Sequence, residues 1–462
     1  MSEQHDLLEM AQKQLVLAGK TLVDDITNEP IVSNYPDLEK ITSDWIDSFK
    51  QEIDKFSQQI SSLTVPKSEL RQLVDYGDLL YNFTETIVIY YTALQQQQQT
   101  PTLLPGGNSQ DTQQKIQVAQ TVANKLYAVI KDKGLNLYEP NYTALRVIPF
   151  INRLYAGGSD SALPYIVAPR WGYTQAWAWP GYAHEVGHHI YRNVIGLREE
   201  LQAKLTTALV LHSYDYVHLN MWFSWMEEIF ADLFGLLQIG PSFIRSQQYI
   251  TLTSLRGEAM TRLHRGQDAR VAFFHATDNA HPVPYLRVYL SLKALTLLGQ
   301  DMTALEKQWE AFFEPVQASL GWMRADVTKM TGKRKLAWGV RSHEVKEKAV
   351  LFLSLILHIP LDALAGPDGQ PRSIHKLFYD PTQQDTMKNA IDRCKAVINN
   401  PSLDNVYHQL ITSDIFQNNP DIRTVIAVAE YAFEHLEIEQ FQAFNKALFD
   451  FIQKQSQHLP AV

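Results

Sequence analysis

Three histidines and one glutamate lie close together in the segment AHEVGHHIY, residues 183–191. In an α-helix, residues four positions apart lie on the same face, so His184 and His188 can direct ring nitrogens at one metal ion. His189 is rotated by about 100° from His188, and we expect it to pack or hydrogen-bond locally. Gly187 keeps this part of the helix thin, which would leave room for a substrate or a crossing strand.

Glu185 directly follows the first histidine and completes the pattern H-E-x-x-H. In helices with this pattern, the two histidines bind zinc and the glutamate is the general base toward an activated water. The pattern arises by chance in roughly two of every hundred chains of this length, so its context must support it. It begins just after Pro180-Gly181 and has apolar flanks, as a buried metal-binding helix requires.

A catalytic zinc site needs a third protein ligand and an open position. The segment WMEEIFADLFGL, residues 225–236, contains two candidate acids. Glu228 is the predicted ligand, because only Glu228 has an acid, Asp232, four residues later on the same helical face. Asp232 is predicted to hold the outer N–H of a ligand histidine, and Glu227 to be a solvated or substrate-facing acid. An otherwise apolar helix rarely buries such acids without a counter-charge, which Zn²⁺ would supply.

HEVGH and EEIFAD together resemble the paired motifs of the gluzincin metallopeptidases, H-E-x-x-H on one helix and E-x-x-x-D on the next. The resemblance implies that His184, His188 and Glu228 bind zinc, that Glu185 is the base, and that Asp232 supports a ligand histidine. It covers roughly 60 to 100 residues around the two motifs. The 40 positions between the last histidine and the glutamate exceed the spacing of thermolysin-like enzymes. This spacing is closer to that of the membrane-associated prenyl-protein proteases and their relatives, and the subfamily is left unassigned.

Those relatives also carry a His-Pro pair before a later helix, and DNAHPVPYLRVYL contains His281 and Pro282. By this resemblance, His281 would hydrogen-bond the oxyanion that forms at the substrate carbonyl, a role that lowers a barrier by roughly 3 kcal/mol. Tyr285 and Tyr182 are alternatives for this role. Arg287 would then be structural.

Composition places the chain among globular proteins. A chain of 462 residues with 45% hydrophobic residues can bury a large core in two or three lobes. The net charge of −9 and the scattered Lys and Arg residues argue against a nucleic-acid partner. The single cysteine, Cys394, rules out an internal disulfide or a thiolate zinc cluster and suits a reducing compartment. We expect Cys394 to be a buried or partly buried helix residue.

The start of the chain, MSEQHDLLEMAQ, lacks the basic and apolar regions of a signal peptide. The longest apolar run, residues 349–357, is too short to cross a bilayer and is predicted to be a buried helix. We therefore expect a cytoplasmic protein without stable membrane insertion, although export without a cleaved signal would leave no trace. The oligomeric state is left open.

Helical spacing of apolar residues dominates and predicts a mainly α (α+β) fold. The expected arrangement is a zincin-like metallopeptidase core with a small edge β-sheet, flanked by helical N- and C-terminal lobes. The proposed boundaries are an N-terminal helical lobe (1–95), a low-complexity linker or loop (96–113), the core (114–300) and a C-terminal lobe (301–462). The last of these is expected to be nearly all helical.

Two β-rich stretches, residues 142–150 and 163–169, are separated by the turn-forming sequence AGGSDS. Prolines in both stretches confine them to the edges or ends of a sheet. The second stretch, or the segment TQAWAW before the metal helix, would offer an edge to an extended peptide. Trp177 and Trp179 would then line a cleft, with packing in the core as the alternative.

The pattern favours a zinc peptidase that acts on a peptide or protein substrate. Two alternatives remain: an oxygenase with iron held by two histidines and a carboxylate, and a binding or scaffold protein with little turnover. A second string, RSHEVKEK, has Glu347 where the metal pattern needs a histidine. We predict that this string forms a solvated helical face.

Overall fold

The computed structural model describes the chain in segments separated by gaps. The described residues are 10–20, 110–131, 133–137, 146–150, 158–159, 165–254, 265–275, 281–317, 322–328, 335–399, 406–417 and 420–456, with a few isolated positions elsewhere. Most of the predicted N-terminal lobe (1–95) and of the predicted linker (96–113) lies outside these residues. The boundaries between the four predicted segments stay predictions.

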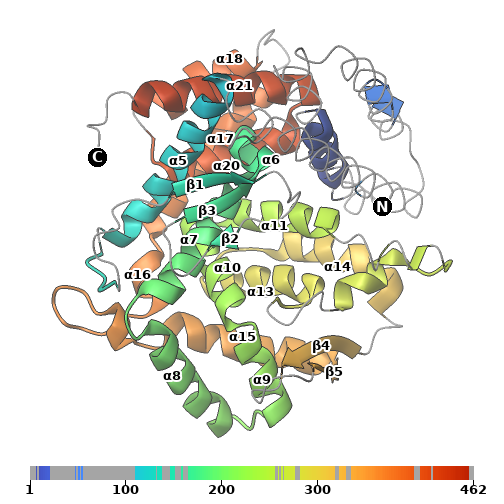
Figure 1. The fold of residues 1–462 in the computed structure, drawn as a ribbon, viewed down its shortest axis with the longest axis vertical. Coiled ribbons are helices and arrows are strands. Elements are labelled where there is room, and N and C mark those ends of the chain that lie inside the picture. Colours follow the sequence, from blue (N-terminus) through green and yellow to red (C-terminus); the bar gives the residue numbers. More distant parts are fainter. Residues whose placement is uncertain are drawn as a thin grey trace, which may run out of the picture.

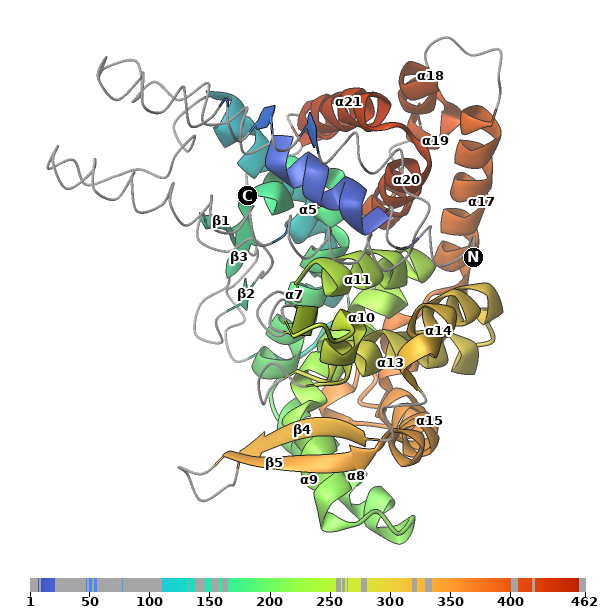
Figure 2. The same ribbon diagram turned by 90° about the vertical axis from the view of Figure 1, so that its right-hand side faces the viewer.

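Helices make up 81% of the described residues, which confirms the mainly α fold. Two helices, α7 (Pro180–Asn193) and α10 (Met226–Ile239), pack against each other near the middle of the molecule (Figures 1 and 2). The buried apolar side chains of the described residues form one contiguous cluster that runs from the first helical segment to the last.

Helices from distant parts of the sequence meet at one end of the molecule. There α20 (Ile422–His435) and α21 (Ile438–Ser456) contact α5 (Gln110–Lys131). At the opposite end lie α8 (Leu197–Leu211) and α9 (Tyr216–Ser224), as Figure 1 shows. α5 therefore belongs to the same packed body as the C-terminal helices.

Twelve further α- and 3₁₀-helices between α5 and α20 are assigned in the described part of the chain. They are α6 (Arg170–Thr174), η1 (Ala176–Ala178), α11 (Pro241–Ser254), η2 (Ala269–Phe274), α13 (Pro284–Leu297), α14 (Thr303–Gln317), α15 (Ser342–His358), η3 (Asp362–Leu364), α16 (Ile374–Phe378), α17 (Pro381–Ile398), α18 (Val406–Thr412) and α19 (Asp414–Gln417). Several begin at a capping residue. Asp215, Asp380 and Asp421 each accept a hydrogen bond from a backbone N–H in the first turn of α9, α17 and α20.

A three-stranded sheet lies beside the central helices. β1 (Arg146–Phe150) pairs in parallel with β3 (Tyr165–Pro169), and β2 (Gly158–Ser159) pairs antiparallel with the other side of β3. The strand predicted over 163–169 is therefore the central strand, and the prediction that it offers a free edge to a substrate is wrong. β2 comes from the segment AGGSDS, which was predicted to be only a turn.

The segment TQAWAW forms no strand. It contains the short helix η1, and both of its indoles are buried. Trp177 stacks on Phe433, and Trp179 packs against Phe449. The alternative of core packing is therefore confirmed, and a substrate-binding strand at this segment is ruled out because its side chains fill the interior against the C-terminal helices.

The expectation of an almost entirely helical C-terminal part is wrong over one segment. β4 (Trp322–Thr328) and β5 (Lys335–Arg341) form an antiparallel hairpin, labelled in Figure 2. Apolar residues alternate along β4 at Met323, Ala325 and Val327. This period of two is typical of a strand, so the sequence did contain the signal.

The crossing of α7 and α10 depends on a glycine. A Cβ atom at Gly187 would lie 2.7 Å from the Cα atom of Ala231, closer than real carbon atoms approach. The space expected for a substrate or a strand is instead filled by a helix. At its far end, α10 stops at Gly240, whose φ of +65° lies in the left-handed region that glycine tolerates.

Two further expectations concern single features. Cys394 is buried on α17, as predicted. The apolar run 349–357 lies within α15, most of which is packed against other helices. Among the described residues, no helix combines the length and the apolar composition that a membrane span requires.

Candidate metal centre

Helix α7 presents two imidazoles on one face. Pro180 occupies the first turn, where its fixed φ suits a helix start and its missing N–H costs nothing. One and two turns further on, His184 and His188 point the same way, and their Nε2 atoms lie 3.0 Å apart. The four-residue spacing therefore brings two potential ligand nitrogens together.

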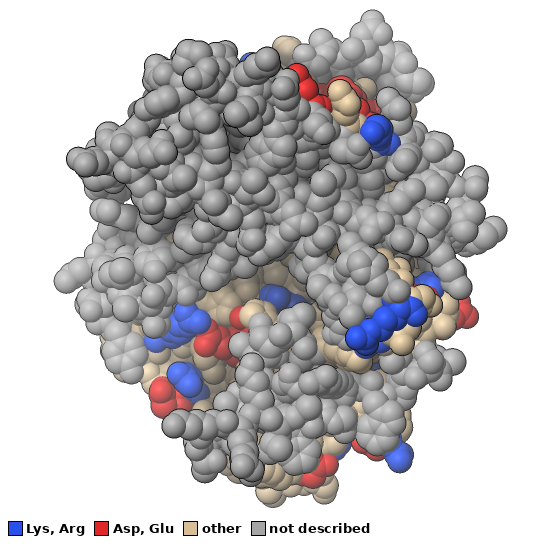
Figure 3. Space-filling view, turned by 45° about the vertical axis from the view of Figure 1, so that its right-hand side comes forward, with Lys and Arg blue, Asp and Glu red and all other residues tan. Residues whose placement is uncertain are grey.

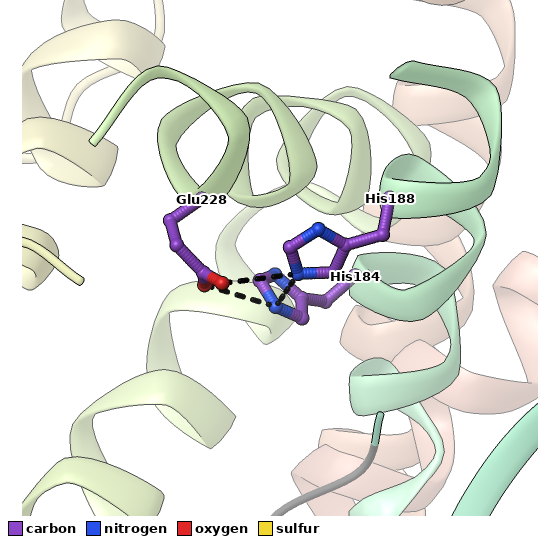
Figure 4. Close-up of side chains that lie close together, drawn as sticks. All are labelled: His184, His188 and Glu228. Carbon is purple, nitrogen blue, oxygen red and sulfur yellow. Dashed lines mark hydrogen bonds and ion pairs between the residues drawn. The ribbon is translucent and has the colours of Figure 1, made fainter. Parts of the chain in front are cut away.

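Glu228 reaches the same point from α10. Its Oε2 atom lies 3.5 Å from Nε2 of His184, and its Oε1 atom lies 3.3 Å from Nε2 of His188. Figure 4 shows the carboxylate facing both rings across the gap between the two helices. Because α10 packs directly on α7, a side chain as short as glutamate bridges that gap.

The spacing of these three residues fits a zinc ion. Zinc bonds of about 2.0–2.1 Å to nitrogen and oxygen, arranged tetrahedrally, place neighbouring ligand atoms about 3.3 Å apart. The three separations are 3.0, 3.3 and 3.5 Å. Among the described residues, His184, His188 and Glu228 are the group of His, Cys, Asp and Glu side chains placed to hold a metal.

His184 is held from its outer side. Its Nδ1 atom lies 2.9 Å from Oδ1 of Asp232, one helical turn after Glu228. Arg287 in turn donates hydrogen bonds of 2.7 and 2.8 Å to the two oxygens of Asp232. The structure thus brings Asp232 to the position expected of it, and it gives Arg287 the task of holding Asp232.

His188 is held in the same manner by a residue that was expected elsewhere. Its Nδ1 atom lies 2.9 Å from Oε1 of Glu227, and Arg192 forms an ion pair with the same oxygen. Glu227 was predicted to be a solvated or substrate-facing acid; its side chain is 29% exposed, but the crossing of the helices turns Oε1 toward the imidazole. Arg192 lies one turn after His188, so both side chains lie on the face of α7 that meets Glu227.

The oxygens of Glu228 have two further neighbours. Nε2 of His281 lies 3.2 Å from Oε1, and Nη2 of Arg287 lies 3.4 Å from Oε2. The two alternatives to His281 are engaged elsewhere: Tyr285 donates to Glu310, and Tyr182 donates to the carbonyl of Gly172. Of the three candidates for an oxyanion donor, only His281 contacts a residue of the cluster.

Glu185 is buried, and its Oε2 atom has no hydrogen-bond partner. Its charge acts to raise the pKa of both His188 and Arg287, so the carboxylate lies in the field of the cluster. A buried carboxylate oxygen without a hydrogen-bond partner lowers the stability of a folded protein.

The charges around the two histidines do not balance. The carboxylates are Glu185, Glu227, Glu228 and Asp232, and the guanidinium groups are Arg192 and Arg287. With neutral imidazoles the cluster carries a net charge of −2. A single divalent cation would neutralise this charge, and so would protonation of both imidazoles.

The same carboxylates act on the pKa values of the two imidazoles. Burial acts to lower both pKa values, but hydrogen bonds to Asp232 and Glu228 outweigh it and raise the pKa of His184. The contacts with Glu227 and Glu228 likewise raise the pKa of His188 to about 10. Burial acts to raise the pKa of Glu228, yet its cationic neighbours hold that pKa well below its usual value.

His189 faces away from the cluster, as predicted from its rotation on the helix. Its Nε2 atom lies 3.2 Å from the hydroxyl of Tyr127, and its Nδ1 atom lies 3.0 Å from the amide of Asn193. Burial, followed by the charge of Arg192, lowers the pKa of His189 to about 4. The third histidine of the motif is therefore a neutral packing residue.

Described Lys and Arg side chains and described Asp and Glu side chains both lie on the face that Figure 3 shows.

No family model, curated protein or solved structure matches this chain. The likeness of the two motifs to those of gluzincins therefore stays a prediction. The case for a metal centre rests on the distances, the burial and the charge balance of the cluster.

Proposed function

We propose that the protein is a zinc-dependent peptidase, with zinc held by His184, His188 and Glu228. The observation that carries this proposal is the spacing of these three side chains, which suits a tetrahedral zinc ion, together with the buried carboxylate of Glu185, whose Oε2 atom has no hydrogen-bond partner. A zinc ion bound here would act as a Lewis acid that polarises a carbonyl and activates water. Peptide-bond hydrolysis needs both effects.

Glu185 is the general base of the proposed reaction. It takes the proton of the attacking water as the new C–O bond forms at the substrate carbonyl. It then gives that proton to the amine nitrogen as the C–N bond breaks. The free Oε2 atom and its burial suit this exchange, because a group that must accept and return a proton cannot be locked in a permanent salt bridge.

His281 is the proposed donor to the oxyanion. Its side chain is 39% exposed, against 10% for Glu228, so it lies on the solvent side of the cluster where a substrate would enter. Removal of one such donor typically lowers kcat by about 10² to 10³. The proposed substrate is a peptide or protein.

The test uses the purified full-length chain. Metal content is measured by elemental analysis, and hydrolysis is measured on a mixed peptide library, for the wild type and Glu185→Gln. We expect one zinc per chain in both, with activity at least about 100-fold lower in the variant. Glu347→Gln is the matched control, because Glu347 is exposed on α15.

Each of the other outcomes has a definite meaning. Equal hydrolysis in the wild type and Glu185→Gln would contradict the mechanism. Iron in place of zinc, with oxygen-dependent turnover, would identify the oxygenase. Bound zinc without any hydrolysis by the wild type would identify a binding or scaffold protein.

A further inference from the structure

The two histidines of the proposed metal site have matching supports. Each donates its Nδ1–H to a carboxylate, and each carboxylate is bound by an arginine. The two chains of contacts are His184–Asp232–Arg287 and His188–Glu227–Arg192. The first was expected in part, whereas the second has no counterpart in the paired motifs.

Neighbouring residues of α10 contact opposite sides of one imidazole. Glu227 lies 2.9 Å from Nδ1 of His188, and Glu228 lies 3.3 Å from Nε2 of the same ring. Adjacent helix residues are rotated by about 100° from each other, which spreads their carboxylates around the ring. The ring is therefore held at both nitrogens by one turn of a single helix.

A neutral imidazole has one N–H group, and its other nitrogen carries the lone pair that binds a metal. The acceptor at Nδ1 favours the tautomer with Nδ1–H, which leaves the lone pair on Nε2 beside Glu228. We infer that Glu227, held by Arg192, is a positioning residue that fixes the tautomer and orientation of His188 for metal binding. This inference rests on the proposed function only in that it requires the metal.

The two supports differ in their exposure to solvent. The Asp232 side chain is 7% exposed, whereas those of Glu227 and Arg192 are 29% and 28% exposed. Salt and water screen the second pair more strongly. Glu227 should therefore contribute less than Asp232, and its contribution should fall as the salt concentration rises.

The decisive measurement is zinc affinity, from competition with a chromophoric chelator on the full-length chain. Loss of a carboxylate that orients a ligand histidine typically weakens metal binding by about 10- to 100-fold. We expect a loss of about 10-fold for Glu227→Ala and a larger loss for Asp232→Ala. Glu347→Ala should match the wild type.

Two further readouts separate positioning from general stability. Cobalt substituted for zinc should show a shifted visible absorption band in Glu227→Ala, because the orientation of one ligand changes. The unfolding midpoint of the metal-free chain should stay near that of the wild type. Glu227→Asp keeps the negative charge on a shorter side chain and should recover part of the zinc affinity. This variant replaces Glu227→Ala in the test if the alanine variant fails to fold.

A double-mutant cycle tests the role of Arg192. If Arg192 acts through Glu227, Arg192→Gln should weaken zinc binding less than Glu227→Ala does. Combining the two substitutions should then add little to the effect of Glu227→Ala. Fully additive losses would overturn the link between the two residues.

The outcomes distinguish this inference from the proposed function. Unchanged zinc affinity and an unchanged cobalt spectrum in Glu227→Ala would overturn the inference and leave the peptidase standing. Zinc bound by the wild type without peptide hydrolysis would overturn the peptidase and leave the inference standing. A wild-type chain that binds no zinc would overturn both.

Discussion

The Nε2 atoms of His184 and His188 lie 3.0 Å apart on one face of α7, and both face the carboxylate of Glu228. Without an ion, this arrangement crowds ring nitrogens and carboxylate oxygens into a partly buried space. A divalent cation between them would relieve that crowding and balance the excess negative charge. The stability of the protein should therefore respond to metal.

Zinc should stabilise the folded chain. A ligand that binds only the native state adds about 2.7 kcal/mol when its free concentration is 100 times its dissociation constant. We expect the unfolding midpoint to rise on zinc addition to the metal-free wild type and to fall back on chelation. The rise should be absent in His184→Asn and His188→Asn and present in the exposed control His343→Asn. An equal rise in all four proteins would place the bound zinc elsewhere.

Gly187→Ala should destabilise the protein through the crossing of α7 and α10. The added Cβ would lie 2.7 Å from the Cα atom of Ala231, where no flexible side chain can give way. Overpacking of this kind lowers the free energy of unfolding by about 1–3 kcal/mol, although alanine has a higher helix propensity than glycine. The measurement is the urea midpoint of the metal-free chain.

Gly181→Ala is the matched control on the same helix. Nothing lies within 4 Å of a Cβ at Gly181, so alanine there should leave the midpoint unchanged or raise it slightly. Equal midpoints for the two variants would contradict the close approach of the helices.

The pKa of His189, lowered to about 4, predicts an acid-sensitive stability. The unfolded chain takes up a proton on this residue near pH 6.5, whereas the folded chain resists it down to about pH 4. The contribution of neutral His189 to the free energy of unfolding is therefore complete above pH 6.5 and is lost as the pH falls toward 4. The loss is about 3 kcal/mol at most. Against the exposed control His343→Gln, His189→Gln should flatten the pH dependence in this window. An unchanged slope would show that His189 titrates normally.

Cys394 should resist thiol reagents in the native state. Burial raises its pKa to about 12, and the thiolate is the reactive species. We expect slow labelling at pH 8 in buffer and rapid labelling of one thiol per chain in guanidinium chloride. Rapid labelling of the native protein would indicate an opening of α17 from the core.

Several parts of the fold were predictable because their signals are local. The helices that carry the two paired motifs follow from the spacing of their residues, and a glycine, Gly240, ends the second of them. Cys394 lies buried on a helix, as expected. The β4–β5 hairpin also had a local signal, in the alternation along Trp322–Thr328, but the surrounding helical pattern concealed it. All of these features depend on residues that lie close together in the chain.

The order of the strands was not predictable in this way. β3 lies between β1 and β2, although β2 is only two residues long and comes from a segment rich in turn formers. Strand order depends on which chain segments meet in space, and no local periodicity encodes it. The proposed peptide-binding edge at β3 was wrong for this reason.

By itself, the sequence determined which residues share a face: His184 with His188, and Glu228 with Asp232, because the helical repeat depends only on spacing. Only the tertiary structure decided that Glu227 contacts His188, because that contact depends on where two helices cross. The crossing is set by packing of Gly187 against Ala231, and packing of this kind depends on the shapes of both helices at once.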